Sequence, residues 1–137
     1  MKFFLLLGLL ISSFSVSADA LVIKDAWIKN LPPGIPMRAG YMELENNSEK
    51  SLIIVAIESE VFTQVDMHET YEKDGMMSMR PLASLTIAAG TTVELAPGGI
   101  HLMMMQPQKT LKPGDRVAIT LQFDDASTQS LQMIVKK

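Results

Sequence analysis

The chain has 137 residues, 47% hydrophobic and 20% charged, which is enough for one domain with a real hydrophobic core. Its formal net charge is −3 and it contains no run of basic residues, which argues against nucleic acid as a partner. Methionine is abundant at 11 residues and cysteine is absent, so the sequence offers neither disulfides nor thiolate metal ligands.

Residues 1–20 have the pattern of a secretory signal peptide. Lys2 supplies a positive start, an apolar run covers 3–11, and small residues allow cleavage after Ala18 or Ala20. The apolar run is well short of the ~20 residues that a membrane-spanning helix needs, so we expect cleavage rather than anchoring. Since no cysteine is available for lipid attachment, the mature chain is expected to be soluble and exported.

Residues 21–137 read as short apolar runs, rich in β-branched residues and separated by turn residues. In chain order the predicted strands are 21–29, 39–45, 51–58, 65–72, 76–81, 82–87, 91–95, 100–106, 116–123 and 128–135. Trp27 is a candidate core anchor in the first strand, and the proline-rich segment 31–36 predicts a loop. We expect about eight or nine of these ten runs to form strands, and their spacing predicts one all-β domain, a sandwich or a Greek-key barrel.

The predicted strand 100–106 carries unusual chemistry. Alternation places His101, Met103 and Met105 on one face, and Leu102 and Met104 on the other. One face therefore offers an imidazole together with thioethers, while the opposite face is purely hydrocarbon.

The second of the two histidines, His68, lies in another methionine-rich stretch. Asp74-Gly75 predicts a type I′ hairpin turn, which would pair Thr70 with Met79. His68 shares a face with Thr70, so His68 and Met79 become diagonal neighbours, roughly 7–8 Å apart at the backbone. A slip of one residue in this register would send Met79 to the opposite face.

Two pairs therefore emerge, His68 with Met79 and His101 with Met103. Neutral thioethers are soft ligands that favour Cu(I) over zinc, calcium or magnesium. A blue-copper redox site would need a cysteine ligand, and the sequence has none. No nucleophile elbow, phosphate-binding glycine loop or EF-hand pattern is present, so we expect a binding protein and not an enzyme.

The remaining methionines are not predicted to be primary metal ligands. A lone strand methionine usually fills the core, and this is the prediction for Met42, Met104 and Met133. Met105 could be a reserve ligand and Met37 could cover the site from its loop, although a surface role is the simpler interpretation for both. Met67, Met76 and Met77 stay ambiguous, and the first two should point away from His68.

At these positions the sequence resembles the PCu(A)C family of periplasmic copper chaperones, formerly a domain of unknown function. The family motif H-x10-M-x21-H-x-M is matched by His68, Met79, His101 and Met103. Further segments similar to the family are 25–28, 39–41, 67–69, 79–81, 97–99 and 111–115, so the resemblance extends from about residue 21 to 135.

The resemblance implies a cupredoxin-like Greek-key β-barrel and Cu(I) binding by His68, Met79, His101 and Met103. It also implies a periplasmic location and delivery of copper to the CuA centre of a respiratory oxidase, as part of cytochrome c oxidase assembly and copper homeostasis. The expected transfer partner is an apo-oxidase subunit or a Sco-type thiol protein.

Two alternatives remain open on the sequence. A periplasmic copper storage or resistance protein would have the same ligands without transfer to an oxidase. A metal-free secreted β-sandwich could instead bind a protein partner through its methionine surface, because exposed methionines make adaptable contacts.

Overall fold

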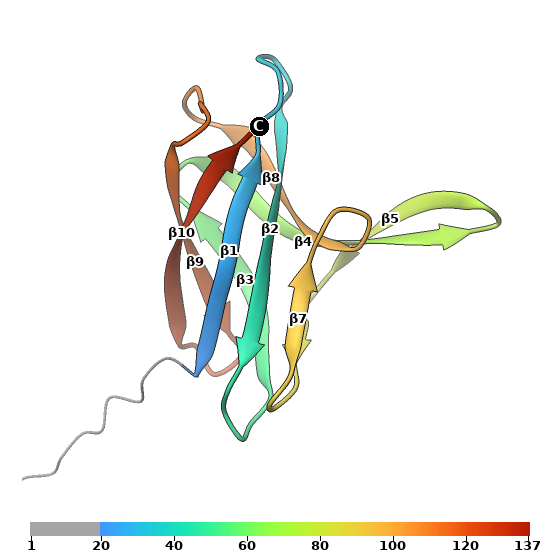
Figure 1. The fold of residues 1–137 in the computed structure, drawn as a ribbon, viewed down its shortest axis with the longest axis vertical. Coiled ribbons are helices and arrows are strands. Elements are labelled where there is room, and N and C mark those ends of the chain that lie inside the picture. The colour runs from blue at the N-terminus through green and yellow to red at the C-terminus, as the bar shows by residue number, and fades with distance from the viewer. Residues whose placement is uncertain (1–19) are drawn as a thin grey trace, which may run out of the picture.

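A computed structural model describes residues 20–137, and apart from Ala20 the predicted signal peptide lies outside the described residues. The described chain forms ten strands: β1 (Leu21–Lys29), β2 (Met37–Asn46), β3 (Leu52–Ser59), β4 (Phe62–Lys73), β5 (Met76–Leu82), β6 (Leu85–Ile87), β7 (Thr92–Leu95), β8 (Ile100–Pro107), β9 (Arg116–Phe123) and β10 (Thr128–Lys136) (Figure 1). Across this part of the chain, no helix has the length and apolar character needed to cross a membrane.

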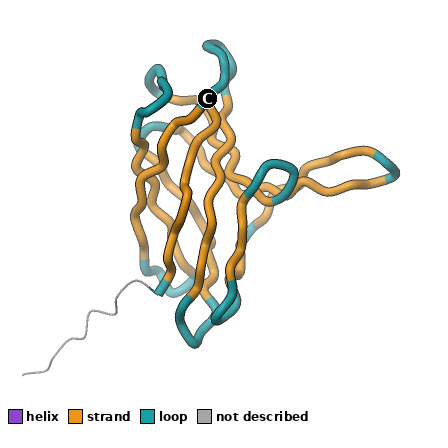
Figure 2. Tube along the Cα trace, in the orientation of Figure 1, coloured by secondary structure: helices purple, strands orange, loops and turns teal. Residues whose placement is uncertain are grey.

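Seven of these strands close into a barrel in the order β4-β8-β2-β1-β10-β9-β3, and β3 returns to pair with β4. All the neighbouring pairs in the ring are antiparallel except β1 and β10, which are parallel. The three remaining strands are additions, since β5 pairs with β4, β6 with β3 and β7 with β2. Figures 1 and 2 show the β4–β5 hairpin projecting from the side of the barrel, while the longer loops gather at its ends.

The inside of the barrel is filled by alternate residues of the strands, as the period of two requires. Met42, Met104 and Met133 are at most 3% exposed, which confirms their prediction as core residues. They pack with fully covered aliphatic side chains that include Leu21, Ile28, Leu44, Ile54, Ile87, Leu102, Val117, Ile119, Leu121 and Val135. Because the inward-facing side chains form the core, the outward-facing side chains of each strand can be polar or functional groups.

The prediction of Trp27 as a core anchor is wrong, and a β-bulge explains why. The pairing of β1 with β2 shifts between Lys24 and Trp27, and Asp25 has a φ of 51°. The extra residue reverses the alternation after it, so Ile28 enters the core at 0% exposure. Trp27 lies half-buried outside and stacks on Tyr41, with ring centroids 4.8 Å apart.

The second strand begins earlier than predicted. Met37 lies in β2 and pairs with Met105 of β8, rather than in the preceding proline-rich loop. The cross-strand partner supplies backbone hydrogen bonds that local sequence does not reveal, because β8 is distant in the chain. Met37 therefore has a fixed position beside the methionine strand.

Candidate metal centre

The hairpin register predicted from Asp74-Gly75 is confirmed. Lys73 pairs with Met76 and Thr70 pairs with Met79, and the two turn residues have φ values of 52° and 75°. A type I′ turn needs positive φ at both of these positions, which Asp and Gly tolerate. Met79 consequently lies on the same face of the hairpin as His68.

The barrel brings the two histidines together. His68 of β4 is directly opposite His101 of β8, and their ring centroids are 6.0 Å apart with the planes tilted by 43°. Both side chains are on the outer face, since their strand neighbours Met67 and Leu102 point into the core at 5% and 0% exposure. The imidazoles thus form a pair on the barrel wall.

His101 is covered although it faces outward. Pro97 and Gly98 of the turn before β8 line the same cavity as His101, and the residue is only 7% exposed. Its Nδ1 lies 3.1 Å from the carbonyl oxygen of Gly99. A carbonyl can only accept, so Nδ1 carries the hydrogen and donates it, which leaves the lone pair of a neutral ring at Nε2. This hydrogen bond fixes both the tautomer and the orientation of a nitrogen donor.

The two proposed thioether ligands meet at a small cavity beside this ring. The cavity has a volume of about 180 Å³, and Met79, His101 and Met103 all line it. Met103 is half-buried two residues beyond His101, whereas Met79 on the projecting hairpin is 57% exposed. His68 does not line the cavity itself, but its ring is beside that of His101. The structure therefore gathers all four predicted residues in one place.

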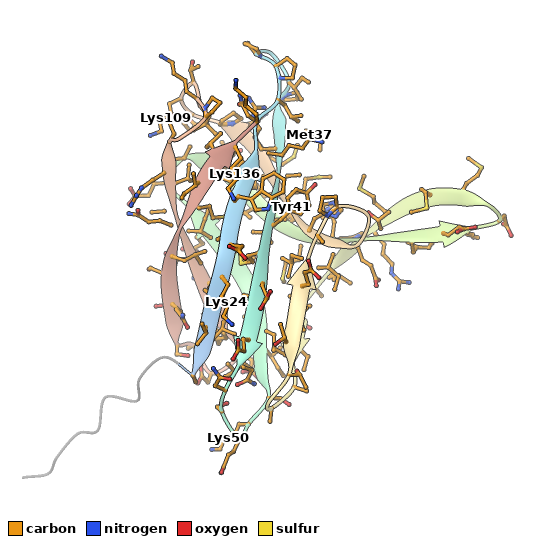
Figure 3. All side chains as sticks on the ribbon, viewed as in Figure 1. Lys24, Met37, Tyr41, Lys50, Lys109 and Lys136 are labelled. Atoms are coloured by element: carbon orange, nitrogen blue, oxygen red, sulfur yellow. The ribbon has the colours of Figure 1, made fainter. Side chains whose placement is uncertain are left out.

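The lining of the cavity includes residues that the sequence analysis did not assign to the site. They are Met37, Arg38, Ala39, Tyr41, Thr70, Pro97, Gly98 and Leu102. Figure 3 labels Met37 and Tyr41, which both come from β2. Burial raises the pKa of the Tyr41 phenol above its ordinary value. The Pro97-Gly98-Gly99 turn was visible in the sequence as a turn. Which residues it lies beside depends on the path of β7 and β8, which the sequence alone does not give.

His68 shows an unsatisfied polar atom. Its Nδ1 is buried and has no hydrogen-bond partner within residues 20–137. Buried polar atoms are nearly always paired, and exceptions often mark a place for a ligand. A metal ion is one partner that would satisfy such a nitrogen.

Replacing His68 by leucine in the metal-free protein is therefore expected to leave the free energy of unfolding unchanged or to raise it. The substitution removes a buried nitrogen that has no partner and keeps a side chain of similar size. Urea denaturation in the presence of a chelator measures this, with Met104→Ala, expected to lose roughly 2–5 kcal/mol, as the control for sensitivity. A loss for His68→Leu as large as that of the control would show that His68 has a structural role.

The other methionines differ in the strand face on which they lie. Met67 is buried in the core, and Met76 is 71% exposed on the opposite face of the hairpin, so both point away from His68 as predicted. Met77 shares the face of Met79 but is nearer the turn and 63% exposed. Met105 is half-buried on the face of His101, opposite Met37. None of these four lines the small cavity.

Polar contacts hold the hairpin on its far side. Arg80 donates from Nε to the carboxylate of Glu69 at 2.8 Å, and its Nη2 lies 2.7 Å from the same oxygen. The guanidinium also lies 5.0 Å from the centre of the Tyr71 ring. These groups are on the face opposite to Met79, so the Glu69–Arg80 ion pair is kept away from the Met79 sulfur.

This arrangement offers a donor set of two imidazole nitrogens and two thioether sulfurs. Within residues 20–137, no group of three or more His, Asp or Glu side chains is placed to hold a metal ion. Neutral nitrogen and sulfur donors suit a soft monovalent ion such as Cu(I), and they leave its charge uncompensated. Such a site can bind the ion without enclosing it, because one thioether lies on an exposed hairpin.

Comparisons with known proteins give both a family and a fold. Residues 21–135 match the model of the family described as "LpqE-like: Putative lipoprotein LpqE-like". "Putative lipoprotein Lxx21020" of Leifsonia xyli subsp. xyli is 34% identical over 120 residues, which are 87% of this chain and 71% of that protein.

Two solved structures are similar to the described barrel. The "Copper-bound PCuAC domain from PmoF2" has a TM-score of 0.73 at 19% identity, covering 86% of this chain and 93% of that domain. "CuI-DR1885 from Deinococcus radiodurans" has a TM-score of 0.66 at 30% identity, covering 91% of this chain and 83% of that one. The predicted all-β, cupredoxin-like barrel is confirmed by these likenesses and by the closed seven-strand ring.

Proposed function

This chain belongs to the LpqE-like family, and we propose that it is an exported Cu(I)-binding metallochaperone and not an enzyme. The observation that carries the proposal is the meeting of His68, His101, Met79 and Met103 at one place on the outer wall of the barrel. These four side chains are the proposed copper ligands. The names of the two similar structures describe copper-bound and Cu(I)-bound proteins, which supports copper as the ion.

The geometry supports binding of one ion by preoriented donors. His101 offers Nε2 because its Nδ1–H is held by Gly99, and His68 has a buried nitrogen in need of a partner. Met103 is fixed on the barrel wall by the pairing of β8 with β2 and β4. Soft sulfur donors beside imidazoles favour Cu(I) over the harder divalent ions.

The exposure of Met79 supports release as well as binding. A thioether is the weakest donor in the set, and this one is 57% exposed on the projecting hairpin. In the proposed transfer, a thiolate or imidazole of the recipient binds copper first, and the bond to Met79 then breaks. Copper stays monovalent throughout, so no oxidant or reductant is needed. The remaining protein ligands are displaced in turn as the recipient completes its own site.

The proposed recipient is an apo-oxidase subunit that builds a CuA centre, or a Sco-type thiol protein on the same assembly pathway. Both present thiolates, which bind Cu(I) more strongly than thioethers and give the transfer its direction. We further propose a periplasmic location, from the signal-peptide pattern and from membership of a family described by a lipoprotein name.

Loading the purified protein with one equivalent of Cu(I) is expected to raise its melting temperature and then to allow transfer to an apo-CuA domain. A ligand that binds only the folded state must stabilise it, by about 4 kcal/mol at a free concentration of 1,000 times Kd. Differential scanning calorimetry measures the first step. The copper content of the acceptor, determined by elemental analysis after separation of the two proteins, measures the second.

The controls distinguish the alternatives. Zn(II) and Mg(II) at the same concentration should give a smaller shift, since the thioethers bind them poorly. A shift with Cu(I) but no transfer to CuA or Sco-type acceptors would favour copper storage or resistance. Absence of any shift with Cu(I) would leave a metal-free protein that binds a partner, and the chaperone proposal would be abandoned.

A further inference from the structure

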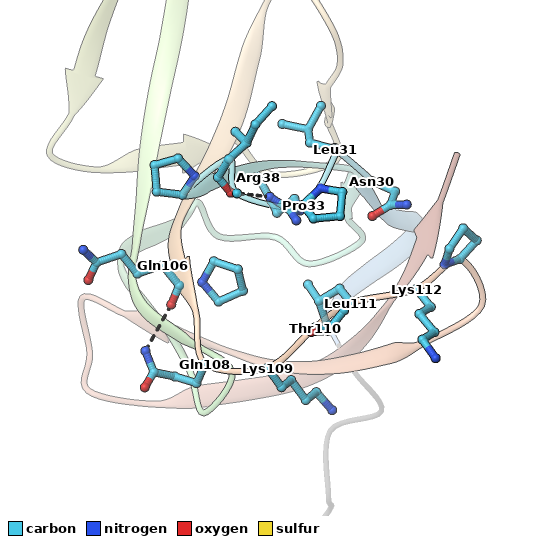
Figure 4. Close-up of a pocket in the computed structure, with 15 residues that line it drawn as sticks. Asn30, Leu31, Pro33, Arg38, Gln106, Gln108, Lys109, Thr110, Leu111 and Lys112 are labelled. Atoms are coloured by element: carbon cyan, nitrogen blue, oxygen red, sulfur yellow. Dashed lines mark hydrogen bonds between the residues drawn. The ribbon is translucent and has the colours of Figure 1, made fainter.

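A second and larger cavity lies at one end of the barrel. It has a volume of about 730 Å³ and is formed by the β1–β2 loop, 30–36, and the segment 106–113 that leads from β8 towards β9 (Figure 4). Its size is within the usual range of small-molecule sites. Of the described residues, Arg38 alone lines both this pocket and the small cavity beside His101.

Arg38 is a buried cation that points inward from β2. It pairs with Met104, whose side chain is in the core, and it is itself only 5% exposed. Its Nη1 donates a hydrogen bond of 2.8 Å to the carbonyl oxygen of Ile35 (Figure 4) and another of 2.8 Å to that of Met37, so the guanidinium is held in place. A buried charge is costly unless an opposite charge pairs with it.

No such counter-charge comes from the described chain. The ion pairs within residues 20–137 involve Lys24 and Arg80, and Arg38 has none. Its Nε is buried without a hydrogen-bond partner in the described part of the chain. Since Nη1 is already engaged, the unused edge of the guanidinium is the Nε–Nη2 side, which binds a planar oxyanion through two parallel hydrogen bonds.

The rest of the lining favours an organic anion. Lys109 and Lys112 add two more positive charges, and none of the described lining residues is Asp or Glu, although the chain as a whole has a net charge of −3. Asn30 Oδ1 is a second buried polar atom without a partner among the described residues, but as an acceptor it does not itself attract an anion. The remaining walls are largely apolar, from Leu31, Pro33, Ile35, Pro36, Pro107, Leu111 and Pro113.

We propose that this pocket binds a small organic carboxylate, with the carboxylate on Arg38 and an apolar body against the proline and leucine walls. Contact through both Nε and Nη2 requires the buried Nε to become uncovered, and the loop residues that line the pocket can shift more readily than paired strands. Lys109 and Lys112 attract the anion to the mouth of the pocket. Arg38 is not one of the proposed copper ligands, so carboxylate binding can be tested on the metal-free protein.

The test is titration of chelator-treated protein with benzoate, followed by amide NMR and by isothermal titration calorimetry. Benzoate is expected to bind with one equivalent and to move the signals of residues in 30–38 and 106–112. Neutral benzamide and inorganic phosphate are the comparison probes, and both should bind at least tenfold more weakly, because each lacks either the charge or the apolar body.

Arg38→Met should weaken benzoate binding by roughly tenfold to a hundredfold, the range for loss of charge-assisted hydrogen bonds. Lys50→Met is the matched control, because it removes one positive charge at the opposite end of the barrel, as the labels of Lys50 and Lys109 in Figure 3 show. If Arg38→Met fails to fold, the double variant Lys109→Met and Lys112→Met replaces it, with an expected weakening of roughly twofold to fivefold for exposed charges.

Three outcomes would overturn the proposal. Benzoate could leave the pocket signals unmoved, or it could bind equally well to the Arg38→Met and Lys50→Met variants. Phosphate could bind as tightly as benzoate, which would show that the apolar walls contribute nothing and that the ligand class is wrong.

Discussion

The substitution His101→Asn is expected to lower the affinity for Cu(I) by roughly 100-fold or more, while the metal-free protein stays folded. Loss of a group that merely orients a metal ligand typically costs 10–100-fold, so loss of the ligand itself should cost at least as much. Asparagine can still donate from its amide nitrogen to the Gly99 carbonyl, the contact that Nδ1 makes now. It has no imidazole, and its hard amide oxygen is a poor ligand for Cu(I).

Competition with a colorimetric Cu(I) chelator measures the affinity, and circular dichroism checks the fold. Thr70→Val is the matched control, since Thr70 lines the same cavity but supplies no proposed ligand. Its affinity should equal that of the parent protein. Retention of full Cu(I) affinity by the folded His101→Asn variant would remove His101 from the ligand set and, with it, the main support for the chaperone proposal.

The second large effect is expected from Met79→Leu, with roughly a tenfold or greater loss of Cu(I) affinity. Leucine keeps the apolar character and approximate size of methionine, so the change isolates the sulfur atom. Because Met79 is on an exposed hairpin, its replacement should not change the free energy of unfolding measurably. The same chelator competition gives the affinity, and urea denaturation gives the stability.

Met76→Leu provides a close control on the same hairpin strand. Met76 and Met79 are both more than half exposed, but they face opposite sides, because Met76 pairs with Lys73 and Met79 with Thr70. Only the variant at position 79 should lose affinity. Equal losses for the two variants would mean that exposed methionines bind copper without regard to the hairpin register, and the proposed four-ligand site would not stand.

Taken together, the ligands differ in how firmly the fold holds them. His101 is buried and hydrogen-bonded to Gly99, whereas Met79 is on a hairpin that projects from the barrel. A site with one firmly held ligand and one exposed ligand can retain copper when no other protein is bound, and can release it to a competing donor. This difference in exposure is the structural basis of the proposed direction of ligand exchange.

Local sequence determined the strands and the faces of the strands. The predicted limits of β1 and β9 coincide with the structure, and alternation correctly separated His101 and Met103 from the buried Leu102 and Met104. The Asp74-Gly75 turn also fixed the register that places Met79 beside His68. These features depend on neighbours in the chain, so turn chemistry and side-chain periodicity suffice to predict them.

The tertiary structure alone decided what comes together from distant parts of the chain. It placed His68 opposite His101, moved Trp27 out of the core through the bulge at Asp25, and turned Arg38 inward beneath the loops. Pairing between strands that are far apart in sequence is set by closure of the whole barrel, not by any local turn. The residue types of the proposed copper site are therefore readable from the sequence, whereas their convergence and the unpaired cation of Arg38 are properties of the closed fold.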